Sequence, residues 1–529
     1  MTAQTVSSQL IAQSYDAVPY PGLAVTRSQP DFLETVARLR GMTPAPAARA
    51  RVLELGCAAG QNLLPLAERY PEATFVGVDV SPRQIQEART IASELSLQNV
   101  EFQLHDLVDL KPSGHKFDYI LAQGVYSWVE EPVRERLLGI CRDQLAPQGV
   151  AFVSYKTYPG WRLHDVFRHM MQYDARATVT PAEKMQKSRQ VLELLKQCFD
   201  EKRALDNLIQ EELAPLAQLS DSYLWHDHLA PVSQPVLFKD FMAHADRYQL
   251  QLLGEATLGV RPIDVLDPET EQHLAALTSD PIQQEQFRDM IRNRAIRQTL
   301  LVHQSTKVAA TMETAFLAGM HLSAAIQPEN PPLDLRSDGV SHFTTLAGGR
   351  ISTPVVLAKA ALQHLGEVWP ASVEIDDLVR EATSRVQAVG APTPGPAEIQ
   401  RLQDNLMQCL VGGVLQASCG PDAYVATISE KPSVSLLARL QAGRSEIVTS
   451  RRHHAVRFDA LDRMVITLLN GTHNRAALVD GLIAASQRGQ LIVSAPGEQA
   501  VTPEQIRQAF VEALPVALER LKTHAMLVA

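Results

Sequence analysis

The sequence is poor in cysteine, in aromatic residues and in long apolar runs, and it has no excess of basic residues. Its five cysteines show neither CxxC pairs nor a metal-ligand spacing, which predicts a reduced protein without disulfides or a zinc site. No window reaches 18 consecutive apolar residues, which argues against a membrane-spanning helix. A net charge of -10 and a pI near 5.9 argue against a chain that mainly binds nucleic acid.

The N-terminal stretch MTAQTVSSQLIAQSYD lacks the basic and apolar regions of a signal peptide. We therefore expect a cytoplasmic protein. A hydrophobic content of 45% and a charged content of 20% are typical of globular proteins. A chain of 529 residues is too long for one core, so about three or four domains are expected. The sequence leaves the oligomeric state open.

Short apolar runs alternate with helical patterns between residues 50 and 155. The runs are RVLEL, ATFVGVDV, NVEFQL, FDYILA and GVAFVSY, separated by stretches such as PRQIQEARTIASEL. This alternation predicts an α/β fold with a parallel sheet and helices on both faces. Residues 248–256 and 297–303 are further strand candidates that could return to the same sheet. A mostly helical insertion is expected at about 162–245.

The alternation of strand and helix patterns stops after residue 305, where proline-rich connectors separate helical patterns. We place domains at 1–304, 305–430 and 431–529. The middle domain is expected to contain helices followed by a short strand, YVATIS. The last domain is expected to contain two helices, a loop with LIVSAP and a closing helix. These orders predict winged-helix-like α+β domains, which often bind DNA. Basic residues do not cluster on the presumed recognition helices, so we favour protein docking or dimerisation.

Most of the recognisable chemistry lies in VLELGCAAGQN, residues 52–62, where a strand runs through a glycine turn into a helix. Gly56 and Gly60 allow a close approach that a Cβ would block, and the helix start offers unpaired N–H groups. The next strand ends at Asp79, which is suited to accept two hydrogen bonds from a ribose diol. A third strand ends at Asp106, near an expected adenine amino group. The turn is neither GxGxxG nor GxxxxGK[ST], which disfavours a dinucleotide or a nucleoside triphosphate.

These acids at successive strand ends resemble those of the class I methyltransferases. The resemblance implies a Rossmann-like sheet that binds S-adenosyl-L-methionine, without a metal. The segments SYDAVPYPG, AQGVYSWV, LAPQGVAFVSYKTYPGW, YLWHDHL, ARLQAG and RFDALDRMVITLLNGTHNRAALVD resemble a narrower bacterial family. That family comprises methyltransferases with a methyltransferase regulatory domain, which include protein-lysine methyltransferases of outer-membrane proteins. The chain departs from it in having YKT and HDH where YNT and HEY are expected.

The resemblance implies a set of cofactor-binding residues on the N-terminal arm and at the strand ends. Asp79 would hold the ribose, Asp106 with Leu107 would frame the adenine, and Gln123 with Gly124 would touch the methionine part. The full set is Tyr15, Tyr20, Glu54, Gly56, Cys57, Ala58, Gly60, Asn62, Asp79, Val80, Asp106, Leu107, Gln123 and Gly124. The two arm tyrosines would form a lid over the cofactor, with a packed surface arm as the alternative.

Aromatic residues after the fourth and fifth predicted strands are candidates for the acceptor pocket, because aromatic walls suit a sulfonium or an ammonium. Core packing is the alternative for Tyr155, Tyr158 and Trp161, and anchoring of the following helix, EPVRERLLGICRDQL, is the alternative for Trp128. The candidate catalytic residues are Tyr126, Trp128, Tyr155, Tyr158, Trp161 and His226. His226 and His228 lack a further ligand cluster, so a structural or substrate-orienting role is favoured over a metal. Lys156 is expected to be solvated or paired with a carboxylate.

The sequence therefore predicts an S-adenosylmethionine-dependent methyltransferase that acts on protein lysine side chains. A polypeptide is the expected partner. A small-molecule or peptide natural-product methyltransferase is the alternative within enzymes. A non-catalytic, cofactor-sensing regulator that binds DNA is the alternative outside them.

Overall fold

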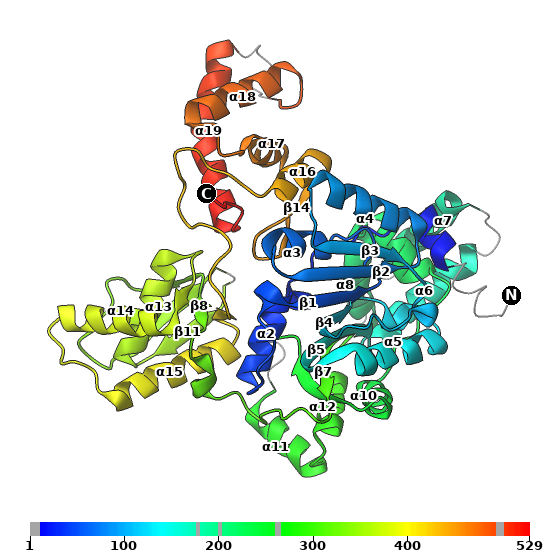
Figure 1. Cartoon of the computed structure of the whole chain (residues 1–529), viewed down its shortest axis with the longest axis horizontal. Helices are drawn as coiled ribbons and strands as arrows, with labels where there is room; N and C mark the ends of the chain where they lie inside the picture. The colour runs from blue at the N-terminus through cyan, green and yellow to red at the C-terminus, as the bar shows by residue number, and fades with distance from the viewer. Residues whose placement is uncertain (1–10, 176–179, 199–203, 260–265, 347, 493–501) are drawn as a thin grey trace.

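The computed structural model forms three lobes, with the large sheet in the first lobe (Figure 1). The middle lobe carries α13 to α15, and the last lobe carries α16 to α19. The structure describes residues 11–175, 180–198, 204–259, 266–346, 348–492 and 502–529.

A seven-stranded sheet organises the first lobe, in the order β3-β2-β1-β4-β5-β7-β6. Strands β1 to β5 are parallel, whereas β7 pairs antiparallel with both β5 and β6. All seven predicted strands are present, and the α/β prediction is confirmed. Their bounds are β1 Arg51–Leu55, β2 Thr74–Asp79, β3 Val100–Leu104, β4 Phe117–Ala122, β5 Leu145–Lys156, β6 Leu250–Glu255 and β7 Ile296–His303.

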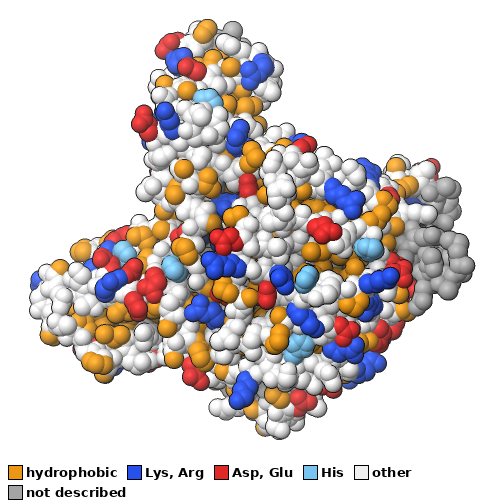
Figure 2. Space-filling model, viewed as in Figure 1, with side chains coloured by type: hydrophobic (Ala, Val, Ile, Leu, Met, Phe, Trp, Pro, Cys, Tyr) orange, Lys and Arg blue, Asp and Glu red, His pale blue; other side chains and the backbone are white. Residues whose placement is uncertain are grey.

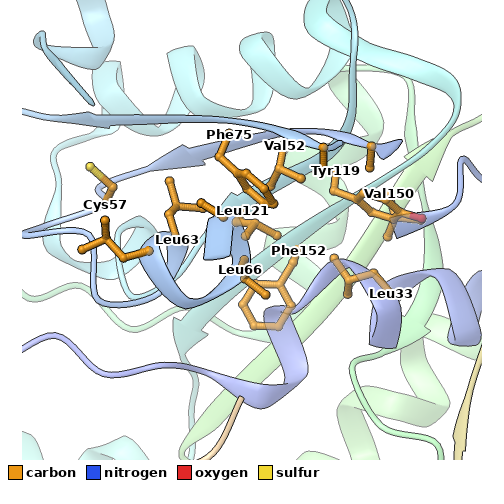
Figure 3. Packing of buried hydrophobic residues seen from close by; sticks show 14 of the residues in the cluster. Leu33, Val52, Cys57, Leu63, Leu66, Phe75, Tyr119, Leu121, Val150 and Phe152 are labelled. Carbon is orange, nitrogen blue, oxygen red and sulfur yellow. The ribbon is translucent and has the colours of Figure 1, made fainter. Parts of the chain in front are cut away.

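Helices cover both faces of this sheet because its central strands are apolar on both sides. On one face, Val52, Phe75 and Phe152 pack against α2, α3 and α4 (Figure 3). On the other face, Leu53 and Ile120 pack against α5 and α10. The bounds are α2 Pro30–Leu39, α3 Leu63–Arg69, α4 Pro82–Glu94, α5 Glu131–Gln144, α10 Phe238–Arg247, α11 Pro268–Leu277 and α12 Pro281–Ile291.

The predicted insertion between β5 and β6 is helical where the structure describes it. Its helices bury a cluster of their own, which includes Phe167, Leu192 and Leu213. Before α10 it contains one turn of π-helix, η5 at Trp225–Leu229. The preceding helices are α6 Trp161–Ala175, α7 Pro181–Cys198, α8 Ala204–Gln218 and α9 Asp221–Leu224.

The middle lobe contains more strands than the sequence patterns predict. Two three-stranded antiparallel sheets, β12-β8-β13 and β11-β10-β9, accompany its three helices. YVATIS, predicted as a strand, contains none, and β13 lies earlier in the chain. The bounds are β8 His321–Ser323, β9 Ile326–Pro328, β10 Ser341–Thr345, β11 Arg350–Thr353, α13 Val356–Val368, β12 Val373–Glu374, α14 Ile375–Ala388, α15 Pro396–Val411 and β13 Gln416–Ser418.

The last lobe packs four helices and a short hairpin around its own buried cluster, which includes Val465, Leu482 and Leu518. Most of the predicted LIVSAP loop lies outside the described residues. In the described part of the chain, none of the helices combines the length and the apolarity required to span a bilayer. The bounds are α16 Leu436–Arg444, β14 Ile447–Thr449, β15 Ala455–Arg457, α17 Ala460–Leu468, α18 Arg475–Gln487 and α19 Pro503–Thr523.

A buried arginine ties β7 to the neighbouring elements β6 and α12. One edge of the Arg297 guanidinium, Nε and Nη2, donates to the fully buried Asp289 at 2.7 and 2.8 Å, and Arg297 Nη1 donates to Glu255 at 2.9 Å. Arg297→Met leaves the Asp289 carboxylate without its partner, so we expect the free energy of unfolding to fall by about 3 kcal/mol. Urea denaturation followed by circular dichroism measures this loss. Arg288→Met, at the more exposed end of the same network, should cost much less.

Candidate functional site

A cavity of about 390 Å³ opens at the carboxyl ends of β1, β2 and β4. Parallel strands of this kind bring their following loops to one edge, which is where α/β sheets bind ligands. The cavity is lined by thirteen of the fourteen predicted cofactor-binding residues. Gly60 is the exception, and of the predicted catalytic residues Trp128 and His226 line the cavity.

The glycine turn after β1 has a backbone that side chains would obstruct. Gly56 and Gly60 both have φ of +79°. A Cβ on Gly56 would lie 2.5 Å from Val125 Cγ2, and one on Gly60 would lie 2.7 Å from Phe102 Cζ. Gly60 thus shapes the turn without contacting the cavity, and the open turn leaves room for a ligand beside the start of α3.

The two acids at the ends of β2 and β3 help to hold the loops at this edge of the sheet, and Asp79 also holds the glycine turn after β1. Asp79 Oδ2 accepts from Ala58 N and its Oδ1 from Ser81 N, both at 2.9 Å. Asp106 Oδ1 caps the next turn by accepting from Val108 N at 3.1 Å. Each carboxylate oxygen has a second lone pair, so further hydrogen bonds from a ligand remain possible. Burial raises the pKa of Asp79, while the backbone N–H donors oppose that shift.

Several buried oxygens at the cavity wall have no hydrogen-bond donor in the described protein. They are Glu54 Oε2, Gln61 Oε1, Gln84 Oε1 and Gln123 Oε1. Buried acceptors are normally satisfied, so this wall fits a ligand that brings N–H or O–H donors. Glu54 Oε1 already accepts from Asn62 Nδ2 at 2.9 Å. Burial raises the pKa of Glu54 to about 8.

Among the described residues, the charge of the cavity lining is negative. Asp79, Asp106 and Asp227 contribute to it, and Glu54, whose raised pKa favours the neutral form, adds a fourth acid that a nearby cation would ionise. Among the described lining residues there is no lysine and no arginine. The cavity therefore suits a cationic ligand and disfavours one with phosphate groups.

An N-terminal arm, residues 11–25, forms part of the cavity wall. Tyr15 stacks on His226 at a centroid distance of 4.4 Å, and Tyr20 meets the same ring edge-on at 5.5 Å. Trp225 Nε1 donates to Ser14 Oγ at 3.0 Å, and Ser222 Oγ donates to the arm's backbone. The insertion thus holds the arm across the carboxyl edge of the sheet.

His226 is a neutral imidazole with a defined tautomer. It is buried, and its Nε2 lies 2.7 Å from the carbonyl oxygen of Val18. A carbonyl can only accept, so Nε2 carries the proton, and Nδ1, which has no hydrogen-bond partner among the described residues, keeps its lone pair. Burial lowers the pKa of His226, which favours this neutral form.

The structure separates the other aromatic candidates from the cavity. Tyr126 and Tyr155 are buried on the face of the sheet that α5 and α10 cover, where both pack against Phe241. Tyr126 Oη lies 2.7 Å from His244 Nδ1, and Tyr155 Oη lies 3.0 Å from Thr299 Oγ1. Tyr158 donates to Asp165, at the start of α6. None of these tyrosines lines the cavity.

Lys156 differs from its prediction as a solvated or carboxylate-paired side chain. It is only 5% exposed, and its Nζ lies 3.4 Å from the ring centroid of Trp128 and 3.8 Å from that of Trp161. Nζ donates to the Asp227 carbonyl at 3.3 Å and to Ser233 Oγ at 3.4 Å. Trp161 thus lies behind the cavity wall, on the other side of this ammonium, instead of in the wall.

Sequence reasoning missed several lining residues. Tyr223 and Asp227 stand in the same YLWHDHL segment that contains His226, and Gln61 is adjacent to the predicted Asn62. Position within these motifs could have identified them. Leu23 and Val25 line the cavity from the arm, where no sequence pattern indicates their position.

One group of side chains in the described residues has a geometry that could hold a metal ion. Glu131, Glu135 and His244 present ligand atoms within 4.8 Å of one another. Glu135 already accepts from Arg247 at 3.0 Å and from Tyr248. The group lies on α5 and α10, and none of its members lines the cavity.

Three family descriptions match successive parts of the chain. Residues 52–149 match a methyltransferase domain, residues 220–303 a predicted methyltransferase regulatory domain, and residues 430–526 the PKMT C-terminal winged helix domain. An uncharacterised protein of Rickettsia prowazekii is 29% identical over 523 residues, which cover 97% of this chain and 93% of that protein. A second one is 34% identical over 241 residues, 45% of this chain and 96% of that protein.

Solved structures agree over nearly the whole chain. PKMT2 from Rickettsia typhi has a TM-score of 0.85 at 27% identity, covering 96% of this chain and all of that one. Its complex with AdoHcy has a TM-score of 0.84 at 28% identity, covering 97% of this chain. The acid-lined cavity at the strand ends fits the cofactor of these proteins. The chain is therefore an S-adenosylmethionine-dependent methyltransferase, with successive matches to a methyltransferase domain, a methyltransferase regulatory domain and a PKMT C-terminal winged helix domain.

Proposed function

We propose that this methyltransferase transfers methyl groups to lysine side chains of a polypeptide. The observation that carries the proposal is the cavity lining, which combines four acids and several aromatic rings with no lysine or arginine among the described residues. Such a lining suits a sulfonium and, beside it, an amine acceptor that arrives as a cation. The similarity to PKMT2, whose name denotes a protein lysine methyltransferase, supports the same acceptor.

The predicted residues divide into those that hold the cofactor and those that shape its surroundings. Asp79 would accept from the ribose, and Asp106 with Leu107 would frame the adenine. Gln123 Oε1 and Glu54 Oε2, both without donors, would accept from the amino-acid part. Tyr15 and Tyr20 of the arm would cover the cofactor. The remaining contacts come from Gly56, Cys57, Ala58, Asn62, Val80 and Gly124.

The acceptor must reach the cofactor as a neutral amine. S-adenosylmethionine supplies an electrophilic methyl whose thioether leaving group is neutral, so no acid is needed. A lysine ammonium must first lose a proton, because its pKa near 10.4 keeps it charged at neutral pH. We propose that Trp128 orients the acceptor and that the free Nδ1 of His226 can take this proton. Tyr126, Tyr155, Tyr158 and Trp161 would support the wall from behind.

We also propose the domain division at residues 304 and 430 and a location in the cytoplasm. Separate buried clusters within residues 317–415 and 434–527 support the division, although Leu39 also joins the middle cluster. All five cysteines are free, which is compatible with a reducing compartment.

Label transfer into a bacterial lysate tests the acceptor class. The enzyme is incubated with S-adenosylmethionine carrying a labelled methyl group, and labelled species are identified by mass spectrometry. We expect the label on lysine residues of proteins. A parallel reaction with Asp79→Asn should show little label and controls for other methyltransferases in the lysate. Label confined to small molecules would reject the polypeptide acceptor while leaving the methyltransferase activity intact.

A further inference from the structure

The turn between β14 and β15, residues 450–454, projects from the last lobe onto the cofactor-binding lobe. It contains the sequence RRHH, residues 451–454, and none of these four residues lines the cavity. His453 at this turn has φ of +61° and is only 2% exposed. A non-glycine residue in this backbone region is uncommon, and here it directs a buried imidazole across the boundary between lobes.

His453 hydrogen-bonds to a residue of the cavity wall. Its Nε2 lies 2.8 Å from Asn62 Oδ1. The same Oδ1 accepts from Val25 N at 3.0 Å, while Asn62 Nδ2 donates to Glu54 Oε1 at 2.9 Å. A backbone N–H can only donate, so it fixes which end of the Asn62 amide is the oxygen. His453 Nε2 must therefore carry the proton.

These bonds place His453 behind two separate parts of the cavity wall. Asn62 holds Glu54, at the end of β1, and Val25, on the N-terminal arm, and all three line the cavity. Burial lowers the pKa of His453 to about 3, so the imidazole is neutral and remains a single-proton donor at ordinary pH.

Further contacts hold the turn in place against the first lobe. Arg69 Nη1 donates to the Arg451 carbonyl at 2.9 Å, and Thr26 Oγ1 donates to the His453 carbonyl at 3.0 Å. Glu68 accepts from Leu437 N at 3.0 Å and pairs with Arg451 at 3.4 Å. Leu437 also belongs to the core cluster of the first lobe. The last lobe is thus fixed at the back of α3, the helix that follows the glycine turn.

We propose that the C-terminal winged-helix domain completes the cofactor site, with His453 as a positioning residue that holds Asn62 in its binding orientation. The domain then acts on the methyltransferase reaction through the cofactor pocket, independently of any acceptor it contacts. Because coupling between two sites is reciprocal, cofactor binding should also steady the 450–454 turn. On the visible face of the last lobe, basic and acidic side chains are interspersed and form no basic stripe (Figure 2). This surface therefore favours a contact with the methyltransferase domain over binding of nucleic acid.

The first test measures the affinity for S-adenosylhomocysteine by calorimetry on the full chain. We expect His453→Ala to weaken binding about tenfold, the size of a lost buried hydrogen bond. His453→Gln, whose amide can still donate, should recover part of that loss. His454→Ala, on an exposed neighbour in the same turn, should leave the affinity unchanged. A folded His453→Ala protein with wild-type affinity would overturn the proposal.

The second test needs no variant, so it stands even if His453→Ala fails to fold. Hydrogen exchange is measured for the wild-type protein with and without S-adenosylhomocysteine. We expect the amides of Ser450 and His453, which are bonded within the turn, to exchange more slowly with ligand. Unchanged exchange at saturating ligand, with slower exchange confined to the cavity segments, would contradict the coupling.

Discussion

Asp79→Asn is expected to weaken binding of S-adenosylhomocysteine by about 100-fold. The carboxylate accepts from Ala58 N and Ser81 N and faces the cavity, where it has lone pairs for the ribose hydroxyls. An amide of the same shape replaces one acceptor with a donor and removes the charge. Two weakened charge-assisted bonds account for about 3 kcal/mol, which corresponds to this factor.

Calorimetry on the wild-type and variant proteins measures this change. Asp109→Asn is the matched control, because Asp109 is exposed on the turn after β3 and lies outside the cavity lining. Circular dichroism must show that both variants are folded, since Asp79 also holds the glycine turn. A folded Asp79→Asn protein with wild-type affinity would remove the ribose assignment.

Lys156→Met is expected to lower kcat/KM for the acceptor about 30-fold at pH 6, with little change in S-adenosylhomocysteine affinity. The ammonium lies between Trp128 and Trp161, and a desolvated cation–π contact contributes about 2 kcal/mol. Without it, Trp128 loses the group that fixes its ring at the cavity wall. The unbranched methionine fills a similar volume and keeps the packing.

The effect of this substitution should depend on pH. Burial lowers the pKa of Lys156 to about 7, which the charge of Asp227 partly opposes. Lys156 is therefore a cation below pH 7 and a neutral amine well above it. Its hold on Trp128 is present at low pH and is lost as pH rises through 7. The charged and titratable groups around it are His164, Asp165 and Arg168 on α6 and Asp227 and His228 on η5.

The ratio of wild-type to variant kcat/KM, measured from pH 6 to pH 9, isolates this titration. Deprotonation of the acceptor affects both proteins equally and cancels in the ratio. Lys239→Met, an exposed lysine on α10, should give a ratio near one throughout. If the Lys156→Met ratio stays constant across the range, the ammonium has a structural role alone.

The sequence predicted the site best where the residues that form it lie close together in the chain. The glycine turn, the acids after β2 and β3 and the strands that carry them follow from patterns within about ten residues, and the structure places them at one cavity. The short strands β8 to β13 were missed because two to five residues carry no measurable alternation.

Side-chain direction was not available from the sequence. Tyr126 and Trp128 are two residues apart in one helical turn, yet Tyr126 enters the core and Trp128 faces the cavity. The burial of Lys156 depends on Trp161 and on Asp227 and Ser233, which lie more than 70 residues later in the chain. His453 meets Asn62 across 391 residues, which only the packing of two lobes determines.

The pairing of β7 has a consequence for how this chain can be divided. The methyltransferase match ends at residue 149 and the regulatory match begins at 220, but β6 and β7 from the second region complete the sheet of the first. A truncation before residue 220 would leave β5, an almost wholly buried strand, as an unpaired edge. Such edges promote aggregation. The two matched regions therefore form one folding unit, and chimaeras between relatives should exchange them together.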